Sequence, residues 1–290
     1  MDKICQALQA GQHPSWEEIV NGWQAAFPLL SQLEKTPQDP TWHAEGDVAT
    51  HTRLVLAEVR KHHQGDRGFL LQLAAIFHDI GKPLTTKRRE VDGQERIVSP
   101  RHAGAGRNYL CLRLAALGLS AELEDAVLAM VALHHHPRRL VQDEAPPACW
   151  HQLARQCPLD LLYDLELADL RGRVCPDLEA QLEIMELFKL RSEELGLWQN
   201  PDPWAVWRSE IDDAFAGRSA AFRRHAFEHT IHDAEAGRIQ SIGEGIARAW
   251  QLKDPAPELI LLWGPSGSGK SEWIARQAKD AQSISLDAIR

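Results

Sequence analysis

The sequence predicts a mainly α-helical chain that ends in a short α/β segment. Up to about residue 250, apolar residues recur at three- and four-residue spacing, which is the period of an amphipathic helix. Alternating apolar and polar runs, which are typical of strands, are scarce. After residue 257 the run ELILLW precedes a glycine-rich turn, and this order favours a buried parallel strand that leads into a helix.

The predicted helices are separated by turn residues such as Gly65-Asp66 and Pro146-Pro147. Residues 85–97 are an exception, because Asp92-Gly93 favours a small hairpin or a mobile loop there. The helical segments that we expect are residues 47–62, 69–80, 104–117, 121–133, 159–171 and 176–198.

Two interruptions suggest how the chain is organised. Residues 200–203 read Asn-Pro-Asp-Pro, and a highly charged helical pattern resumes at Trp204. The charged helical pattern ends at Pro255 and Pro257, and the apolar run ELILLW follows. We therefore expect a helical domain over residues 1–200, a helical bridge over 201–255 and an incomplete domain over 256–290.

The composition is that of an ordinary globular protein, with 44% hydrophobic and 25% charged residues. No run approaches the roughly 18 apolar residues that span a bilayer, and the N-terminus lacks a secretory signal. We therefore expect a cytoplasmic protein with no membrane partner. The net charge of −9 argues against a protein that coats DNA, but it leaves room for a local basic cleft. The five cysteines contain no CxxC pair, so neither a disulfide framework nor a zinc-thiolate site is expected.

The doublet His78-Asp79 is the strongest candidate for a chemical role. Neighbouring positions of a straight helix point about 100° apart, so two adjacent side chains do not share one face. Gly81 and Pro83 follow at once and end the helix, which lets both side chains converge on one ion. The apolar run 69–77 before them would anchor the pair on a rigid, buried element.

Other candidate ligands lie near predicted helix starts and ends. His51 lies on one face of a helix whose opposite face is apolar, and His102 follows Ser99-Pro100 at a helix start. His134 and His135 close a helix just before a proline, and we expect the neighbouring His136 to be structural. Asp169 lies in an otherwise apolar helical face, where a lone carboxylate needs a partner.

This order of residues resembles the HD phosphohydrolase superfamily over about residues 20–195. The family's fold is a helical domain, and some members with additional histidines hold two metal ions. Mixed nitrogen and oxygen ligands favour Mn, Fe, Co, Ni or Zn over Mg. The resemblance assigns metal ligation to His51, His78, Asp79, Asp169, His102 and one or both of His134 and His135.

Asp79 would be shared by both metals, which would activate a water for in-line attack on phosphorus. A lysine after the doublet often approaches the substrate phosphate in this family, so HDIGKP assigns that catalytic role to Lys82. Arg101, Arg138 and Arg139 are further candidates for phosphate contacts.

The sequence GPSGSGKS over residues 264–271 fits the P-loop pattern G-x-x-x-x-G-K-[ST] in full. Such glycines let backbone amides surround phosphates at a helix N-terminus. The motif predicts ATP and Mg²⁺ binding, with the lysine on the β/γ-phosphates and the last serine on the metal. The residues expected to bind the nucleotide are Gly264, Ser266, Gly267, Ser268, Gly269, Lys270 and Ser271.

The following SISLDAIR resembles the kinase domain of polynucleotide kinases. The resemblance makes Asp287 the general base on a 5′-hydroxyl and Arg290 a phosphate contact. A P-loop phosphotransferase needs several further strands and usually lid arginines. We therefore expect a truncated chain without kinase activity of its own.

The two modules together resemble the HD-domain polynucleotide kinases, which are bacterial bifunctional RNA end-healing enzymes. This resemblance implies removal of 2′,3′-cyclic phosphate or 2′/3′-phosphate from RNA (or DNA) ends, with a ligase as the next partner. A nucleotide or dinucleotide phosphohydrolase is an alternative. An HD module that senses nucleotides without turnover is another, although a full set of candidate ligands argues against it.

Overall fold

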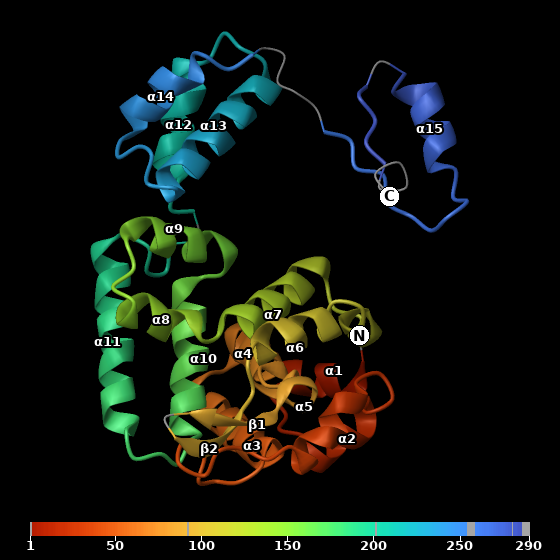
Figure 1. The fold of residues 1–290 in the computed structure, drawn as a ribbon, viewed down its shortest axis with the longest axis vertical. Helices are drawn as coiled ribbons and strands as arrows, with labels where there is room; N and C mark the ends of the chain where they lie inside the picture. The colour runs from red at the N-terminus through yellow and green to blue at the C-terminus, as the bar shows by residue number, and fades with distance from the viewer. Residues whose placement is uncertain (1, 92, 201, 254–258, 280, 286–290) are drawn as a thin grey trace.

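The computed structural model describes residues 2–91, 93–200, 202–253, 259–279 and 281–285. Its fold is mainly helical, as the sequence predicts, and none of its described helices is long and apolar enough to cross a membrane. Within these ranges the one sheet is an antiparallel hairpin of β1 (Lys87–Val91) and β2 (Gln94–Val98) (Figure 1).

Helices account for most of the described chain (Figure 1). In the first part they are α1 (Lys3–Gln9), α2 (Trp16–Trp23), the 3-10 helix η1 (Pro28–Lys35), α3 (Val48–His62), α4 (Gly65–Phe77), α5 (Lys82–Thr85), α6 (His102–Leu110) and the 3-10 helix η2 (Leu114–Leu117). In the second part they are α7 (Ala121–Leu133), α8 (His136–Gln142), α9 (Pro147–Gln156), α10 (Leu159–Arg171), α11 (Leu178–Glu194), α12 (Ala205–Ala214), α13 (Ala220–Glu235), α14 (Ile242–Ala249) and α15 (Lys270–Gln277).

Local signals explain where several helices begin. The Asp47 carboxylate accepts from the Thr50 amide at 2.8 Å and caps α3, and the Ser120 hydroxyl caps α7 in the same way. Helices α7 and α10 have the bounds predicted from the sequence. The helix predicted over 104–117 is instead divided into α6 and η2. The buried leucines of the two helices keep the spacing of one helix face across the break, so the apolar pattern does not reveal it.

Helix α4 lies at the centre of the main core, in contact with α3, α7 and α10. Its residues from Leu73 to Phe77 have no solvent exposure. The Phe77 ring stacks on Trp23 with centroids 5.5 Å apart and contacts Phe27 at 4.9 Å. The C-terminal end of α4 is therefore held in a rigid environment, and the His-Asp doublet follows it directly.

The hairpin is fastened to the loop before α3 by one buried carboxylate. Asp39 is 3% exposed and accepts from the Ile97 amide and from the Arg96 guanidinium, each at 3.2 Å. Gly93 takes a positive φ of 75° at the turn. The hairpin expected over 85–97 is confirmed, with Asp92 outside the described residues.

Helices α12, α13 and α14 pack around a second cluster of buried side chains that includes Ile211, Phe222 and Ile231. Contacts between α13 and α9 join this bundle to the rest of the chain, and Arg155 on α9 pairs with Glu235 on α13 at 3.1 Å (Figure 1).

The predicted strand over 258–263 is wrong for its described residues, 259–263, which form no strand. A parallel strand needs hydrogen-bonded neighbours and burial on both faces. The described part of the chain offers neither, since Leu259 and Leu261 are more than four-fifths exposed and Trp263 is 99% exposed.

Candidate metal centre

The doublet begins at the C-cap of α4. His78 is the capping residue, and the Ile80 amide donates to the Phe77 carbonyl at 3.1 Å in a tight turn. His78 is fully buried and Asp79 is 2% exposed. As expected from the sequence, the helix ends here and both side chains turn toward one place.

A first cluster of donors forms around this turn. His51 on α3 and His78 have Nε2 atoms 3.4 Å apart, and Asp79 Oδ2 lies 3.2 Å from His78 Nε2. Asp169 on α10 completes the cluster, with its Oδ1 2.9 Å from His51 Nε2. The structure thus brings together residues from three helices that are distant in the sequence.

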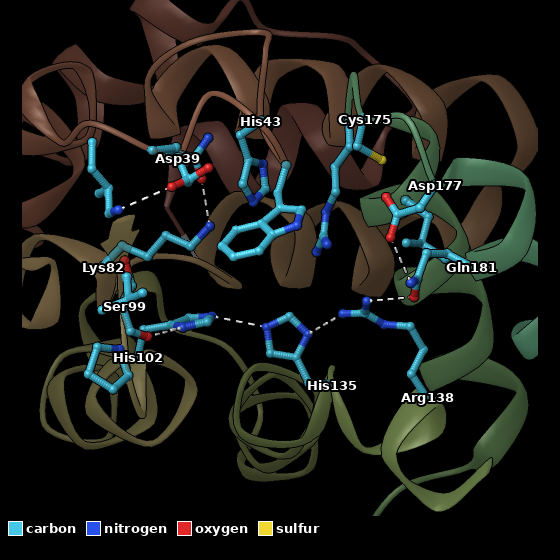
Figure 2. Close-up of a pocket in the computed structure, with 17 residues that line it drawn as sticks. Asp39, His43, Lys82, Ser99, His102, His135, Arg138, Cys175, Asp177 and Gln181 are labelled. Carbon is cyan, nitrogen blue, oxygen red and sulfur yellow. Dashed lines mark hydrogen bonds between the residues drawn. The ribbon is translucent and has the colours of Figure 1, made fainter. Parts of the chain in front are cut away.

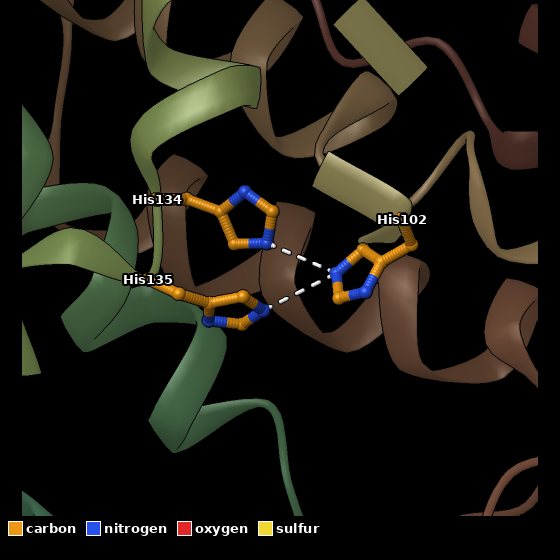
Figure 3. Close-up of side chains that lie close together, drawn as sticks. All are labelled: His102, His134 and His135. Atoms are coloured by element: carbon orange, nitrogen blue, oxygen red, sulfur yellow. Dashed lines mark hydrogen bonds between the residues drawn. The ribbon is translucent and has the colours of Figure 1, made fainter. Parts of the chain in front are cut away.

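A second cluster shares Asp79 with the first. The other oxygen of Asp79, Oδ1, lies 3.1 Å from His102 Nε2 at the start of α6. The Nε2 atoms of His134 and His135 lie 3.4 Å and 3.2 Å from that same nitrogen. Figure 3 shows the three rings turned toward one another. All seven predicted ligands therefore lie in two groups that meet at one carboxylate.

The outer nitrogens of the rings fix their orientation. The Nδ1–H groups of His78, His102 and His134 each donate to a backbone carbonyl at 2.8 Å. His51 Nδ1 lies 3.0 Å from the Glu45 carboxylate. These partners leave the Nε2 lone pairs facing inward, which is the arrangement that metal-binding histidines adopt.

The outer nitrogen of His135 faces charged side chains and not a backbone carbonyl. This nitrogen, Nδ1, lies 3.1 Å from a guanidinium nitrogen of Arg138 and 3.8 Å from the buried Glu166 carboxylate. Arg138 itself forms a close ion pair with Glu166 and donates to Gln181 at 3.0 Å. A fixed charge pair therefore lies against the outer side of this ring.

The donor set fits divalent metal ions. Donors bound to one ion at about 2.1 Å lie about 3 Å apart when they are at right angles, and the contacts between donors within the clusters are 2.9–3.7 Å. Imidazoles and carboxylates suit Mn, Fe, Co, Ni or Zn. The clusters are thus compatible with two ions that share Asp79.

Both carboxylates are held in the charged form. Burial acts to raise the pKa of Asp79, but His78 and Lys82 beside it outweigh burial and keep that pKa well below its usual range. Burial opposes ionisation of Asp169 too, and Arg173 overcomes it, so the pKa of Asp169 is also well below its usual range. Deprotonated carboxylates are the form that binds a metal.

The centre opens into a cavity of about 480 Å³, which Figure 2 shows. Lys82 lies at its wall, with Nζ 2.7 Å from Asp79 Oδ2, and donates to Gln38 at 2.6 Å. Arg138 also lines this cavity, whereas Arg101 and Arg139 line a second one next to it. Lys82 and Arg138 therefore place two cationic side chains in the cavity beside the centre.

Three residues of the site were not predicted from the sequence. Arg173 lies against Asp169, with Nε donating to Oδ1 at 3.1 Å, and lines the cavity. His43 also lines it, and its Nδ1 lies 2.8 Å from Glu45. The four-residue spacing of Asp169 and Arg173 was a usable signal for an ion pair at a helix end. His43 and Glu45 lie in a loop without periodicity, so no comparable signal existed.

The glycine-rich loop leads directly into α15. Gly267 and Gly269 take positive φ angles of 78° and 81°, and Gly269 is the N-cap of the helix. Lys270 Nζ donates to the carbonyls of Gly264 and Pro265 at 2.8 and 2.7 Å. The predicted loop-to-helix order is present, while Asp287 and Arg290 lie outside the described residues.

In a comparison with known protein families, residues 48–170 match the family model described as HD domain. The chain carries an HD domain. All seven residues of the two clusters lie within the matched range, and an HD domain of this kind indicates a metal-dependent hydrolase.

A curated relative of this chain is the "Multifunctional CCA protein" of Pasteurella multocida (strain Pm70), which is 37% identical over 71 residues. The match covers 23% of this chain and 17% of that protein. The similarity therefore concerns a limited segment of both proteins.

Proposed function

We propose that this chain is a metal-dependent phosphoesterase that removes 2′,3′-cyclic phosphate or 2′/3′-phosphate from RNA ends. The observation that carries the proposal is the pair of clusters meeting at Asp79 and opening beside Lys82, Arg138 and Arg173. The P-loop motif farther along the chain supports the choice of a nucleic-acid end, because a 5′-end kinase would act on the same broken strands.

Divalent metal ions held by the two clusters would activate a water and neutralise charge on the phosphoryl oxygens. The chain's own cations would bind and orient the phosphate. Lys82 and Arg173 each lie against a carboxylate of the centre, and both line the cavity. Their positive charges would hold the phosphate between the two clusters, while each cation stays beside its own carboxylate.

As part of a complete kinase domain, the P-loop segment would serve to phosphorylate 5′-hydroxyl ends, and a ligase would then join the healed strands. ATP and Mg²⁺ would bind at the loop over 264–271. This part rests on the motif and on the loop-to-helix geometry around Gly269.

A nucleotide phosphohydrolase is the second candidate, because a cavity of about 480 Å³ lies within the range of small-molecule sites. The test is phosphate release with Mn²⁺, Ni²⁺, Co²⁺ or Zn²⁺ from RNA ending in a 2′,3′-cyclic phosphate, compared with free nucleotides. Faster turnover of the RNA supports the proposal, and turnover of nucleotides alone favours the second candidate. Binding without any turnover favours a nucleotide-sensing module.

A matched pair of variants links the activity to the centre. His51 and His62 are histidines of the same helix, α3, but His62 is 42% exposed in its side chain and lies outside both clusters. His51→Ala should abolish metal-dependent release, and His62→Ala should retain it. Equal activity of the two variants would place the chemistry elsewhere.

A further inference from the structure

The metal centre borders two cavities. The second has a volume of about 650 Å³ and shares part of its lining with the first. The shared residues are Ser99, Pro100, His102, His135 and Arg138. A ligand at the centre can therefore extend in two directions.

The second cavity differs from the rest of the chain in charge. Its lining contains Arg101, Arg138 and Arg139, together with histidines, and no aspartate or glutamate. The first cavity includes Asp39 and Asp177, and the whole chain has a net charge of −9. An acid-free lining with three arginines is therefore a local departure from an acidic protein, and we name it the arginine pocket.

Two of these arginines have no partner among the described residues. Arg138 is bound to Glu166 and Gln181. The side chains of Arg101 and Arg139 are exposed and form no hydrogen bond or ion pair within the part of the chain that the structure describes. Guanidinium groups of this kind suit phosphate oxygens, which they bind with two parallel hydrogen bonds.

The position of the pocket suggests what it binds. The reacting phosphate has cations of its own in Lys82 and Arg173, and these line the first cavity only. Free arginines beyond His102 and His135 would serve further phosphates of the same ligand. A mononucleotide with a single phosphate, such as a 2′,3′-cyclic one, has none to offer, whereas a nucleic-acid strand carries one at every step.

We infer that the arginine pocket binds the phosphodiester backbone of the nucleotides that precede the reacting RNA end. This inference rests on the proposed function for the identity of the reacting end. The strand would enter over Arg101 and Arg139 and place its terminal phosphate between the two metal clusters. The enzyme would then prefer the end of a strand to a mononucleotide with the same terminal phosphate.

The experiment compares a short single-stranded RNA ending in a 2′,3′-cyclic phosphate with adenosine 2′,3′-cyclic phosphate. The variant is the double substitution Arg101→Gln/Arg139→Gln. The matched control is Arg107→Gln/Arg224→Gln, since the side chains of these two arginines are exposed, form no hydrogen bond or ion pair within the described residues and line neither cavity. Both variants change the net charge equally.

In the wild type, kcat/KM for the strand should exceed that for the mononucleotide. The Arg101→Gln/Arg139→Gln variant should lower this ratio by about tenfold or more, the size expected for lost hydrogen bonds to charged groups. Its strand binding, followed by fluorescence anisotropy, should depend less on salt, with the logarithmic slope reduced by about 1.4 for two lost phosphate contacts. The control variant should keep the wild-type ratio and slope.

Several results would overturn the inference. These are equal kcat/KM for strand and mononucleotide in the wild type, an unchanged ratio and slope in Arg101→Gln/Arg139→Gln, or an equal loss in the control variant. If the wild type turns over neither substrate, the proposed function fails, but the anisotropy measurement still decides whether the pocket binds the strand. Circular dichroism should show both variants folded, because exposed substitutions of this kind change stability little.

Discussion

Gly81 controls how closely α6 approaches the end of α4, and its replacement by alanine is a sharp test of the second metal cluster. A Cβ at this position would lie 2.1 Å from the His102 carbonyl oxygen and 2.5 Å from the Gly106 amide nitrogen. Both are backbone atoms of α6, so no side-chain rotation relieves the clash. The helix that carries His102 must therefore move.

The size of the movement follows from the contact. An ordinary separation begins at 3.4 Å, so the His102 backbone must retreat by about 1.3 Å. Metal sites tolerate deviations of about 0.2 Å in ligand distance, and His102 Nε2 now lies 3.1 Å from Asp79 Oδ1. Gly81→Ala should therefore lose the metal of the second cluster, at a stability cost of about 1–3 kcal/mol for the overpacking.

The assay is the metal-to-protein ratio by mass spectrometry after loading with Mn²⁺, together with thermal unfolding. Gly104→Ala is the matched control, because Gly104 also lies on α6 and nothing lies within 4 Å of its would-be Cβ. We expect Gly81→Ala to bind about one ion fewer per chain and turnover to fall about 100-fold. If Gly81→Ala matched Gly104→Ala in metal content and stability, the proposed role of this close approach would be refuted.

Three further predictions follow from the site. Arg173→Gln should lower kcat/KM by about 100-fold. It should also move the acid limb of the pH–rate profile to higher pH, because it removes the cation that lowers the pKa of Asp169. An acid limb at the wild-type pH would contradict that pairing. Burial lowers the pKa of His134 and of His135 well below the usual range, so these two histidines should destabilise the metal-free protein as pH falls below about 6.5, by up to about 3 kcal/mol per pH unit. Urea unfolding at several pH values checks this, and a stability that rises on acidification would refute it. Mn²⁺ at a thousand times its dissociation constant should raise the free energy of unfolding by about 4 kcal/mol, an effect that EDTA should reverse and that His51→Ala should lack.

Much of the helical core could be predicted because its signals are local. Helices α7 and α10 have the expected bounds, since apolar periodicity and a serine cap at Ser120 act within a few residues. The ligand positions were predictable for a related reason. His78, His102 and His134 all lie at helix ends, where a side chain can leave the helix surface and meet others.

The remaining parts depend on long-range contacts that a sequence does not display. His43 contacts Glu45, and Glu45 contacts His51, from a loop before α3. The same loop is held to the hairpin by the hydrogen bond that Asp39 accepts. The strand expected over 258–263 depended on neighbouring strands, which the described residues do not supply. The roles of Asp287 and Arg290 remain predictions.

In the function that we propose, Asp79 joins two metal clusters in a phosphoesterase that acts on RNA ends. The most direct measurement is Mn²⁺-dependent phosphate release from RNA ending in a 2′,3′-cyclic phosphate, made with the wild type and Asp79→Asn side by side. We predict release by the wild type, and a loss of at least about 1,000-fold in Asp79→Asn because the shared carboxylate is gone. Release that persists in Asp79→Asn, or none from the metal-loaded wild type, would contradict the account.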